Sequence, residues 1–266
     1  MNYSSRIFLY GPLVLVLTIA AAISFHWWRS TSAFEDRLAA IKGREAVPGV
    51  TLDWSSVAIT GYPFRVDAVF EGFSARGEGP RGPFRWDSER LALHSLAYGA
   101  DRKVFEAAGV QRLSWTDAAE RPQNFSFTPG SLRASALRDE NGLVRFDADV
   151  VQLVAPNLSI GRAQFHMRRG EGGKTIDMMA SAEDARGDMG FAFPKGFKAM
   201  TLYQTLHAAE AYGALLKGEG SPKAAHEAWH EKGGAANVTA TEFNGQQNGM
   251  SIEQGMMVNA LLEALY

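Results

Sequence analysis

Five residues near the C-terminal end of the chain, His226-Glu227-Ala228-Trp229-His230, have the H-E-x-x-H spacing of zinc-dependent peptidases. On a helix, two histidines four positions apart can bind one Zn²⁺, and the glutamate after the first histidine stays free to act as a general base. If this stretch is an active site, the protein is a zinc hydrolase that uses His226, Glu227 and His230.

The residues around this motif favour a surface helix instead. At about 100° per residue, both histidines lie beside the apolar stripe of the helix, on the same arc as Lys223 and Glu227. Charged neighbours of this kind are typical of the solvent-facing side of an amphipathic helix. The apolar stripe itself consists of Ala224, Ala225, Ala228 and Trp229.

The third metal ligand is not at its expected place in the sequence. The extended motif H-E-x-x-H-x-x-G-x-x-H is followed as far as Gly233, but Ala236 occupies the position of the third histidine. Glu242 and Glu253 remain as carboxylate ligands, and both lie in strand-like stretches. We therefore assign no catalytic, cofactor-binding or metal-binding residue, and we keep the zinc hydrolase as an alternative function.

The other residues with reactive side chains do not form a recognisable motif. His94, His166 and His207 are single histidines within strand or helix patterns, for which we expect structural roles. The sequence has no Gly-rich phosphate-binding loop and no G-x-S-x-G turn. It also has no cysteine, which excludes disulfides, thiolate metal sites and a cysteine nucleophile. A formal net charge of −2, with interspersed charges, argues against a nucleic-acid partner.

Residues 7–28 form an apolar stretch without Asp, Glu, Lys or Arg. As a helix this stretch would be about 33 Å long at ~1.5 Å per residue, which is enough to cross the hydrocarbon core of a bilayer. We predict a transmembrane anchor at 7–28, preceded by a short tail (1–6) and followed by a helical linker (29–48). Aromatic residues flank the anchor as they do at membrane interfaces, namely Tyr3, Tyr10, Trp27 and Trp28.

The flanks of this anchor bear on its cleavage and its orientation. Three alanines at 20–22 could serve as a signal-peptidase site, but cleavage there would leave an apolar stub on the mature protein. An uncleaved signal anchor is therefore favoured. The positive-inside rule alone would place the C-terminal domain in the cytoplasm, because only Arg6 precedes the anchor. Four basic residues follow it, namely Arg29, Arg37, Lys42 and Arg44.

From residue 50 onward the hydrophobic period becomes that of strands. Val50, Leu52 and Trp54 alternate with polar residues, and the same alternation recurs over 64–70. Only 101–109 interrupts the strand pattern with a helix-like stretch. An antiparallel meander is predicted, forming a curved sheet or a sandwich. Further strand-like runs, separated by Gly, Pro, Asn and Asp, lie at 84–98, 110–115, 124–128, 131–137, 143–155, 161–168, 175–181, 237–245 and 249–255.

Two helices are predicted near the C-terminal end, and the closing residues 256–266 also have a helical composition. Residues 222–232 begin with proline at the first helical position and are followed by a glycine pair. Residues 197–217 have apolar side chains at helical spacing, among them Met200, Tyr203 and Leu206.

Several stretches of the chain, taken in order, resemble one known family. They are RIFLYGPLVLVL in the anchor, the strand pair TLDWSSVAITGYPFRVDAVFEGF, then FRWDSERLALHSLAYGADRKVFEAAG and LRASAL. They are similar to the envelope family of alphaproteobacteria catalogued as domain of unknown function 2125. Its members have a short N-terminus, one anchor and a G-[aromatic]-P-F-R strand, here Gly61-Tyr62-Pro63-Phe64-Arg65. The resemblance implies a periplasm-facing domain on the inner membrane, against the positive-inside count, and it implies no reaction and no catalytic residue.

Together these patterns predict an α+β protein. Its main part is an antiparallel β-rich periplasmic domain at 49–266 with helices near 197–217 and 222–232, tethered by the N-terminal transmembrane helix. Alternating strands leave one apolar face, which must be covered by a second sheet, by the 197–217 helix, or by an acyl chain or other hydrophobic ligand. The expected function is a non-enzymatic envelope protein that binds a lipid or another hydrophobic ligand, or supports an envelope assembly. A purely structural protein and the zinc hydrolase are the alternatives.

Overall fold

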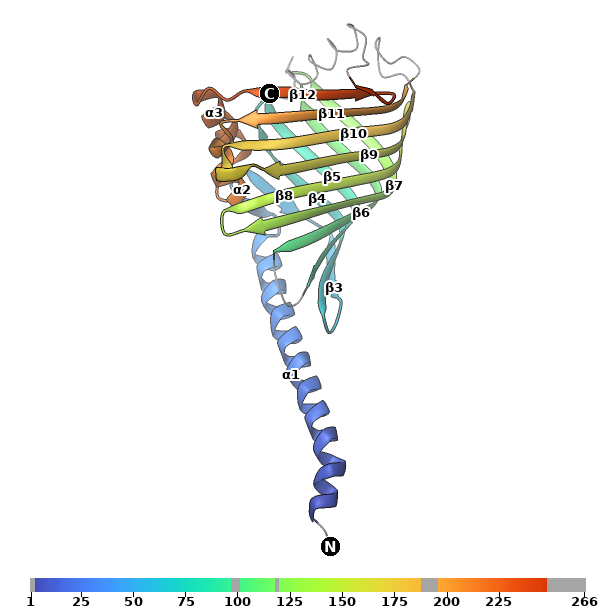
Figure 1. Ribbon diagram of the computed structural model, residues 1–266, viewed down its shortest axis with the longest axis vertical. Coiled ribbons are helices and arrows are strands. Elements are labelled where there is room, and N and C mark those ends of the chain that lie inside the picture. Colours follow the sequence, from blue (N-terminus) through green and yellow to red (C-terminus); the bar gives the residue numbers. More distant parts are fainter. Residues whose placement is uncertain (1–2, 97–100, 118–119, 188–195, 248–266) are drawn as a thin grey trace.

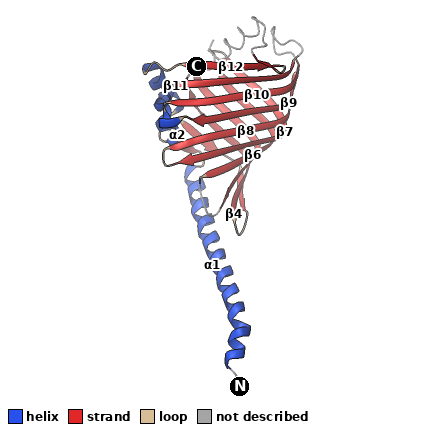
Figure 2. Ribbon diagram, in the orientation of Figure 1, coloured by secondary structure: helices blue, strands red, loops and turns tan. Residues whose placement is uncertain are grey.

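The computed structural model describes residues 3–96, 101–117, 120–187 and 196–247. These residues form a long N-terminal helix, one large antiparallel sheet and a short helical segment near the C-terminal end (Figure 1, Figure 2). The predicted fold class is confirmed, and of its two predicted forms the structure has the curved sheet. The predicted elements at 249–255 and 256–266 lie outside the described residues.

Helix α1 (Tyr3–Ile41) is uninterrupted, and its N-terminal part projects away from the sheet (Figure 1). Over Tyr10–Ile41 it is long and apolar enough to cross a membrane. The predicted helical linker at 29–48 is helical as far as Ile41, where it continues the anchor helix, but its predicted end is wrong because residues 44–47 form the strand β1 (Arg44–Val47). Residues 29–41 contain neither Gly nor Pro, so extending an existing helix costs less than starting a new one.

The sheet is an antiparallel meander in which most strands pair with their sequence neighbours. The exception lies at its N-terminal edge, where β2 and β3 pair with successive parts of β4. After β1, the strands are β2 (Val50–Asp53), β3 (Ser56–Thr60), β4 (Arg65–Gly79), β5 (Gly82–Leu96), β6 (Arg102–Thr116), β7 (Pro122–Asp139), β8 (Gly142–Ala155), β9 (Leu158–Arg169), β10 (Thr175–Gly187), β11 (Phe197–His207), β12 (Ala236–Phe243) and β13 (Gln246–Gln247).

The sheet curls, so that β8–β12 lie in front of β4 and β5 in Figure 1 and one face becomes concave. Strands twist and coil by nature, and bulges increase this bending. The strand register shifts between β5 and β6, between β6 and β7 and between β11 and β12, and within β4 the backbone of Gly72 has a positive φ of 59°. Small side chains on the inner face also permit a tight curl, and alanine is frequent there.

The C-terminal end of α1 covers one part of the concave face. Leu38 is 7% exposed and belongs to a buried cluster with residues of β4, β5 and β6. Phe34 and Ile41, one turn before and one turn after, pack against the same cluster. The other buried members of this cluster are Trp54, Ala68, Phe70, Phe73, Leu91 and Ala107.

A helical segment after β11 closes one end of the curled sheet (Figure 2). It consists of a 3₁₀ turn (Ala209–Tyr212), α2 (Gly213–Lys217) and α3 (Pro222–Glu231). Helix α2 packs against β8 and α3 packs against β4. Because β4 and β8 are separated by three strands within the sheet, this short segment spans the end of the curled sheet from one side to the other.

The predicted helix at 197–217 is wrong over its first half, because Phe197–His207 forms β11. Met200 and Leu206 face inward with the other even-numbered positions, whereas Tyr203 lies on the opposite face of the strand. Met200 and Leu206, six residues apart, fit both the helical and the strand period, and the interspersed Thr201 and Thr205 favour a strand. Only the last part of the range, α2, is an α-helix.

The helix-like interruption at 101–109 is likewise wrong, since it lies in β6. The predicted helix at 222–232 is confirmed as α3. Strand β3 was not predicted as a separate strand, and the two predicted strands at 124–128 and 131–137 form the single long strand β7.

Candidate functional site

The H-E-x-x-H stretch lies on α3, as predicted, and the helix packs through its tryptophan. Trp229 is 2% exposed, and its indole Nε1 donates a hydrogen bond of 2.6 Å to the carbonyl of His207. Ala225 is also buried, whereas His230 and Glu227 are exposed. The helix begins with the Ser221 hydroxyl accepting a hydrogen bond from the amide of Ala224.

The two histidines of this stretch contact each other. The Nε2 atoms of His226 and His230 are 2.9 Å apart, and Nδ1 of His226 lies 3.5 Å from the Tyr212 hydroxyl. Within the described ranges, no three His, Asp or Glu side chains converge in a way that could hold a metal ion. Of the two further carboxylates considered, Glu242 lies on β12 and Glu253 falls outside those ranges. This geometry fits a helix that is held by Trp229 better than a three-ligand zinc site.

Two other predicted structural histidines form Asp–His pairs on the convex face of the sheet. Nδ1 of His94 lies 2.9 Å from a carboxylate oxygen of Asp67, and Nδ1 of His166 lies 2.7 Å from Asp147. The Ser135 hydroxyl also contacts Asp147, at 3.4 Å, so this serine bonds to the carboxylate and not to the imidazole. A serine activated for nucleophilic attack needs the imidazole as its base.

Asp147 is held in its charged form. Partial burial would raise the pKa of Asp147, but hydrogen bonds and charge from His166 and Arg145 outweigh it, and the pKa lies below its ordinary value. The ladder of such pairs along the convex face stabilises cross-strand contacts. It gives the convex face a polar surface typical of a solvent-exposed side of a sheet.

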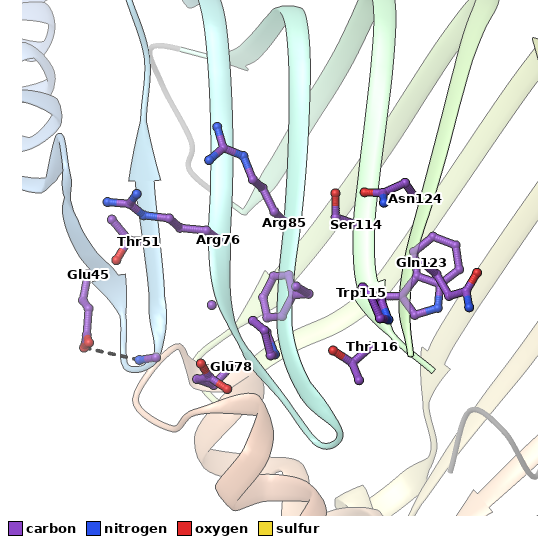
Figure 3. A pocket seen from close by; sticks show the side chains of 15 residues that line it. Glu45, Thr51, Arg76, Glu78, Arg85, Ser114, Trp115, Thr116, Gln123 and Asn124 are labelled. Atoms are coloured by element: carbon purple, nitrogen blue, oxygen red, sulfur yellow. Dashed lines mark hydrogen bonds between the residues drawn. The ribbon is translucent and has the colours of Figure 1, made fainter. Parts of the chain in front are cut away.

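One pocket lies beside the turn between β1 and β2, at the end of the sheet where β4 and β6 end and β5 and β7 begin (Figure 3). Its volume is about 540 Å³. Charges of both signs line it, including Arg76 and Glu78, and the carboxylate of Glu45 accepts a hydrogen bond from the Gly49 amide. Arg85 is already paired with Asp87, outside the pocket, at 2.7 Å. With charges that offset one another, this pocket favours no single class of ligand.

The concave face differs from the convex face in its chemistry. The strand registers define rows of side chains that run across the sheet on this face. One such row, called the central row, contains only apolar residues from β4 to β11. The two neighbouring rows are formed by the residues two positions before and two positions after it along each strand. The central row is Ala68, Leu93, Phe105, Ala134, Ala148, Phe165, Ala180 and Leu202.

This apolar face is only partly covered. Ala68 is fully buried beneath α1, but Ala148, Phe165 and Leu202 are half-buried, and Ala180 is exposed. The second buried cluster, around Trp229 and Leu206, lies under the helical segment at one end. Apolar side chains of β8–β11 between the two clusters therefore remain accessible.

A second pocket, of about 660 Å³, joins the concave face to α1. Its wall on the helix side includes Arg29 and Arg37, and its wall on the sheet side includes Leu93 and Lys103. Lys103 lies in the row next to the central apolar row, between Ser95 and Ala136. The sequence analysis did not predict Lys103 as a site residue, although this lysine occupies a position of the alternating pattern at which apolar residues are expected. Arg29 and Arg37 entered the sequence analysis only as evidence on the orientation of the anchor.

Comparison with known families places most of the chain in one of them. The family described as "Uncharacterized protein conserved in bacteria (DUF2125)" matches residues 27–255. This match covers the end of α1 and the sheet together with the helical segment. No curated protein matches the sequence.

Proposed function

The chain belongs to the DUF2125 family of bacterial proteins, and we propose that it is a membrane-anchored, non-enzymatic protein that binds a lipid on the concave face of its sheet. The main support for this proposal is the row of apolar side chains from β8 to β11, which α1 and the helical segment leave partly exposed. Large accessible apolar surfaces on a folded protein mark sites for hydrophobic partners.

The shape of this face supports an elongated apolar ligand. The row crosses several strands, and neighbouring strands lie about 4.8 Å apart, so the partly covered section from β8 to β11 extends over about 15 Å. Alanines alternate with Phe165 and Leu202 along it, which leaves shallow space between larger side chains. An acyl chain would gain about 0.8 kcal/mol for each methylene that it buries there.

The position of the apolar face relative to the anchor supports a membrane source for the ligand. Helix α1 could anchor the protein in a membrane by its length and composition, and its C-terminal end packs directly on the concave face. A lipid could thus pass from the bilayer to the sheet along the helix without crossing open water, which would expose its acyl chains.

We place this domain in the periplasm, held on the inner membrane by an uncleaved anchor. The resemblance of the anchor and of the GYPFR strand to envelope proteins supports this placement, although the positive-inside count opposes it. The structure offers a reason for the discrepancy, since Arg29 and Arg37 line a pocket and so have a use besides orientation. Alkaline phosphatase fused at the C-terminus should be active, and the chain should retain residues 1–28 in its mature mass. An inactive fusion with an active cytoplasmic reporter would refute the placement.

Site-specific photocrosslinking in cells tests the lipid-binding function. The photoreactive residue p-benzoylphenylalanine is placed either at Ala180, exposed on the concave face, or at the adjacent Ser181, which points to the convex face. We expect lipid adducts by mass spectrometry at position 180 and none at 181. Protein adducts alone at 180 would favour a scaffold of an envelope assembly, and no adduct there would favour a purely structural role.

A further inference from the structure

The pocket between α1 and the sheet carries an excess of positive charge. Arg29 and Arg37 approach it from the helix, and Lys103 approaches it from β6. No Asp or Glu is among its lining residues. Neither arginine forms an ion pair with a carboxylate in the described part of the chain. By contrast, arginines on the convex face such as Arg145 and Arg162 are paired with aspartates at 2.8 and 2.7 Å.

Lys103 sits in surroundings that disfavour its charge. It is the single charged residue in its row, which continues through Ala136, Phe146 and Met167. Its ammonium donates a hydrogen bond of 2.6 Å to the Ser95 hydroxyl, which is neutral. Burial lowers the pKa of Lys103, and the charge of Asp101 offsets this only in part. An anion in the pocket would compensate the ammonium.

The apolar floor of the pocket is continuous with the concave face. Leu93 belongs to the central apolar row, and Val66 lies in the row that contains Lys103. Phe34 of α1 also lines the pocket and packs on the buried cluster of the sheet. A ligand with a charged end between the arginines and Lys103 would therefore have apolar surface directly beyond that end.

Helix α1 and the turn before β4 are joined by several contacts beside this pocket. The hydroxyls of Ser24 and Tyr62 share a hydrogen bond of 2.7 Å, and the Trp27 indole donates one of 2.8 Å to the carbonyl of Arg65. The rings of Trp27 and Tyr62 also meet edge to face, with their centroids 5.3 Å apart. Exposed apolar and aromatic side chains gather around these contacts, and such residues favour the bilayer interface: Phe25, Trp28, Tyr62, Phe64 and Leu96.

We propose that this pocket binds the anionic phosphate headgroup of a membrane lipid. The guanidinium groups of Arg29 and Arg37 and the ammonium of Lys103 would contact the phosphate, since arginine is suited to bidentate phosphate recognition. The acyl chains would extend along the concave face. This inference rests on the proposed lipid-binding function and names the class of lipid.

The test compares soluble short-chain lipids that share acyl chains and differ in charge. The full chain in a non-ionic detergent is titrated with dihexanoyl phosphatidylglycerol, with dihexanoyl phosphatidylcholine and with inorganic phosphate, and binding is followed by calorimetry. We expect at least a tenfold preference for the phosphatidylglycerol, decreasing as salt screens the charges. Inorganic phosphate should bind far more weakly because it lacks the apolar part.

Variants then locate the preference. In Arg29→Gln/Arg37→Gln and in Lys103→Gln the affinity for the anionic lipid should fall about tenfold or more, as expected when a charge-assisted contact is lost, and the preference over phosphatidylcholine should be lost with it. The matched control is Arg168→Gln, an exposed arginine of β9 on the convex face, which should change neither affinity. Unchanged thermal unfolding of each variant shows that the fold is intact.

The outcomes separate this inference from the proposed function. Equal affinity for the two lipids overturns the headgroup site but leaves lipid binding standing. Binding of neither lipid overturns the proposed function and the headgroup site with it. Phosphate that binds as tightly as the anionic lipid overturns the lipid source of the anion. An anionic preference that survives in both pocket variants overturns the assignment to this pocket.

Discussion

Replacing Leu38 by alanine should loosen the attachment of α1 to the sheet. The side chain is 7% exposed within the cluster that includes Phe70 and Leu91. The substitution removes three carbons, which at ~0.8 kcal/mol each corresponds to about 2.4 kcal/mol of lost transfer free energy. The cavity left behind adds to this, so we expect a total loss of about 3 to 4 kcal/mol.

Thiol labelling can measure this loss in the full chain, because the sequence has no cysteine. A single cysteine replaces Ala107, which is 2% exposed in the same cluster, and its reaction with a thiol reagent reports opening of the contact. A loss of 3 kcal/mol should accelerate labelling about 150-fold in Leu38→Ala. The control Glu35→Ala, at an exposed position of the same helix, should leave the rate within about twofold. Equal labelling rates in Leu38→Ala and in the unchanged background would refute the packing of α1 on the sheet.

Two further predictions concern α3 and the convex face. In urea unfolding, Trp229→Ala should destabilise the protein by about 3 to 5 kcal/mol and His230→Ala by less than about 1 kcal/mol. Tight binding of one Zn²⁺ per chain in calorimetry, lost in His226→Ala, would instead support the zinc hydrolase hypothesis. The lowered pKa of Asp147 means that its contribution is present above its unfolded value of 3.8 and is lost as pH falls through the lower folded value. Asp147→Asn should therefore be less stable than the unchanged protein by about 0.5 to 1 kcal/mol at pH 7. This difference should shrink as pH falls below 3.8 and through the lower folded pKa of Asp147, and a difference that does not shrink with falling pH would contradict the hydrogen-bonded carboxylate.

Local sequence patterns predicted most strands correctly because alternation is a local property of the chain. They failed where two periods fit the same residues, as in 197–207, where Met200 and Leu206 suit either a helix or a strand. The pairing of that segment with β10 and β12 decided in favour of the strand. The helix and strand propensities of single residues predict secondary structure poorly where tertiary contacts can satisfy the backbone hydrogen bonds of either form.

The candidate site was less predictable than the fold. The sequence singled out His226 and His230 by their spacing, yet the described residues provide no third ligand near them. The sequence also contains Arg29, Arg37 and Lys103, but Lys103 is far from the two arginines along the chain. Only the return of β6 alongside the end of α1 brings these three basic side chains to one pocket.

By itself the sequence determined the apolar helix, the antiparallel strands and the existence of one apolar sheet face, because each depends on residues close together in the chain. Only the tertiary structure decided how the sheet curls, which part of that face is covered by Leu38 and Trp229, and which part stays accessible around Ala180. Those features arise from bulges and from contacts between distant segments. The free energy of such contacts depends on the complete set of partners, and no local stretch of sequence contains it.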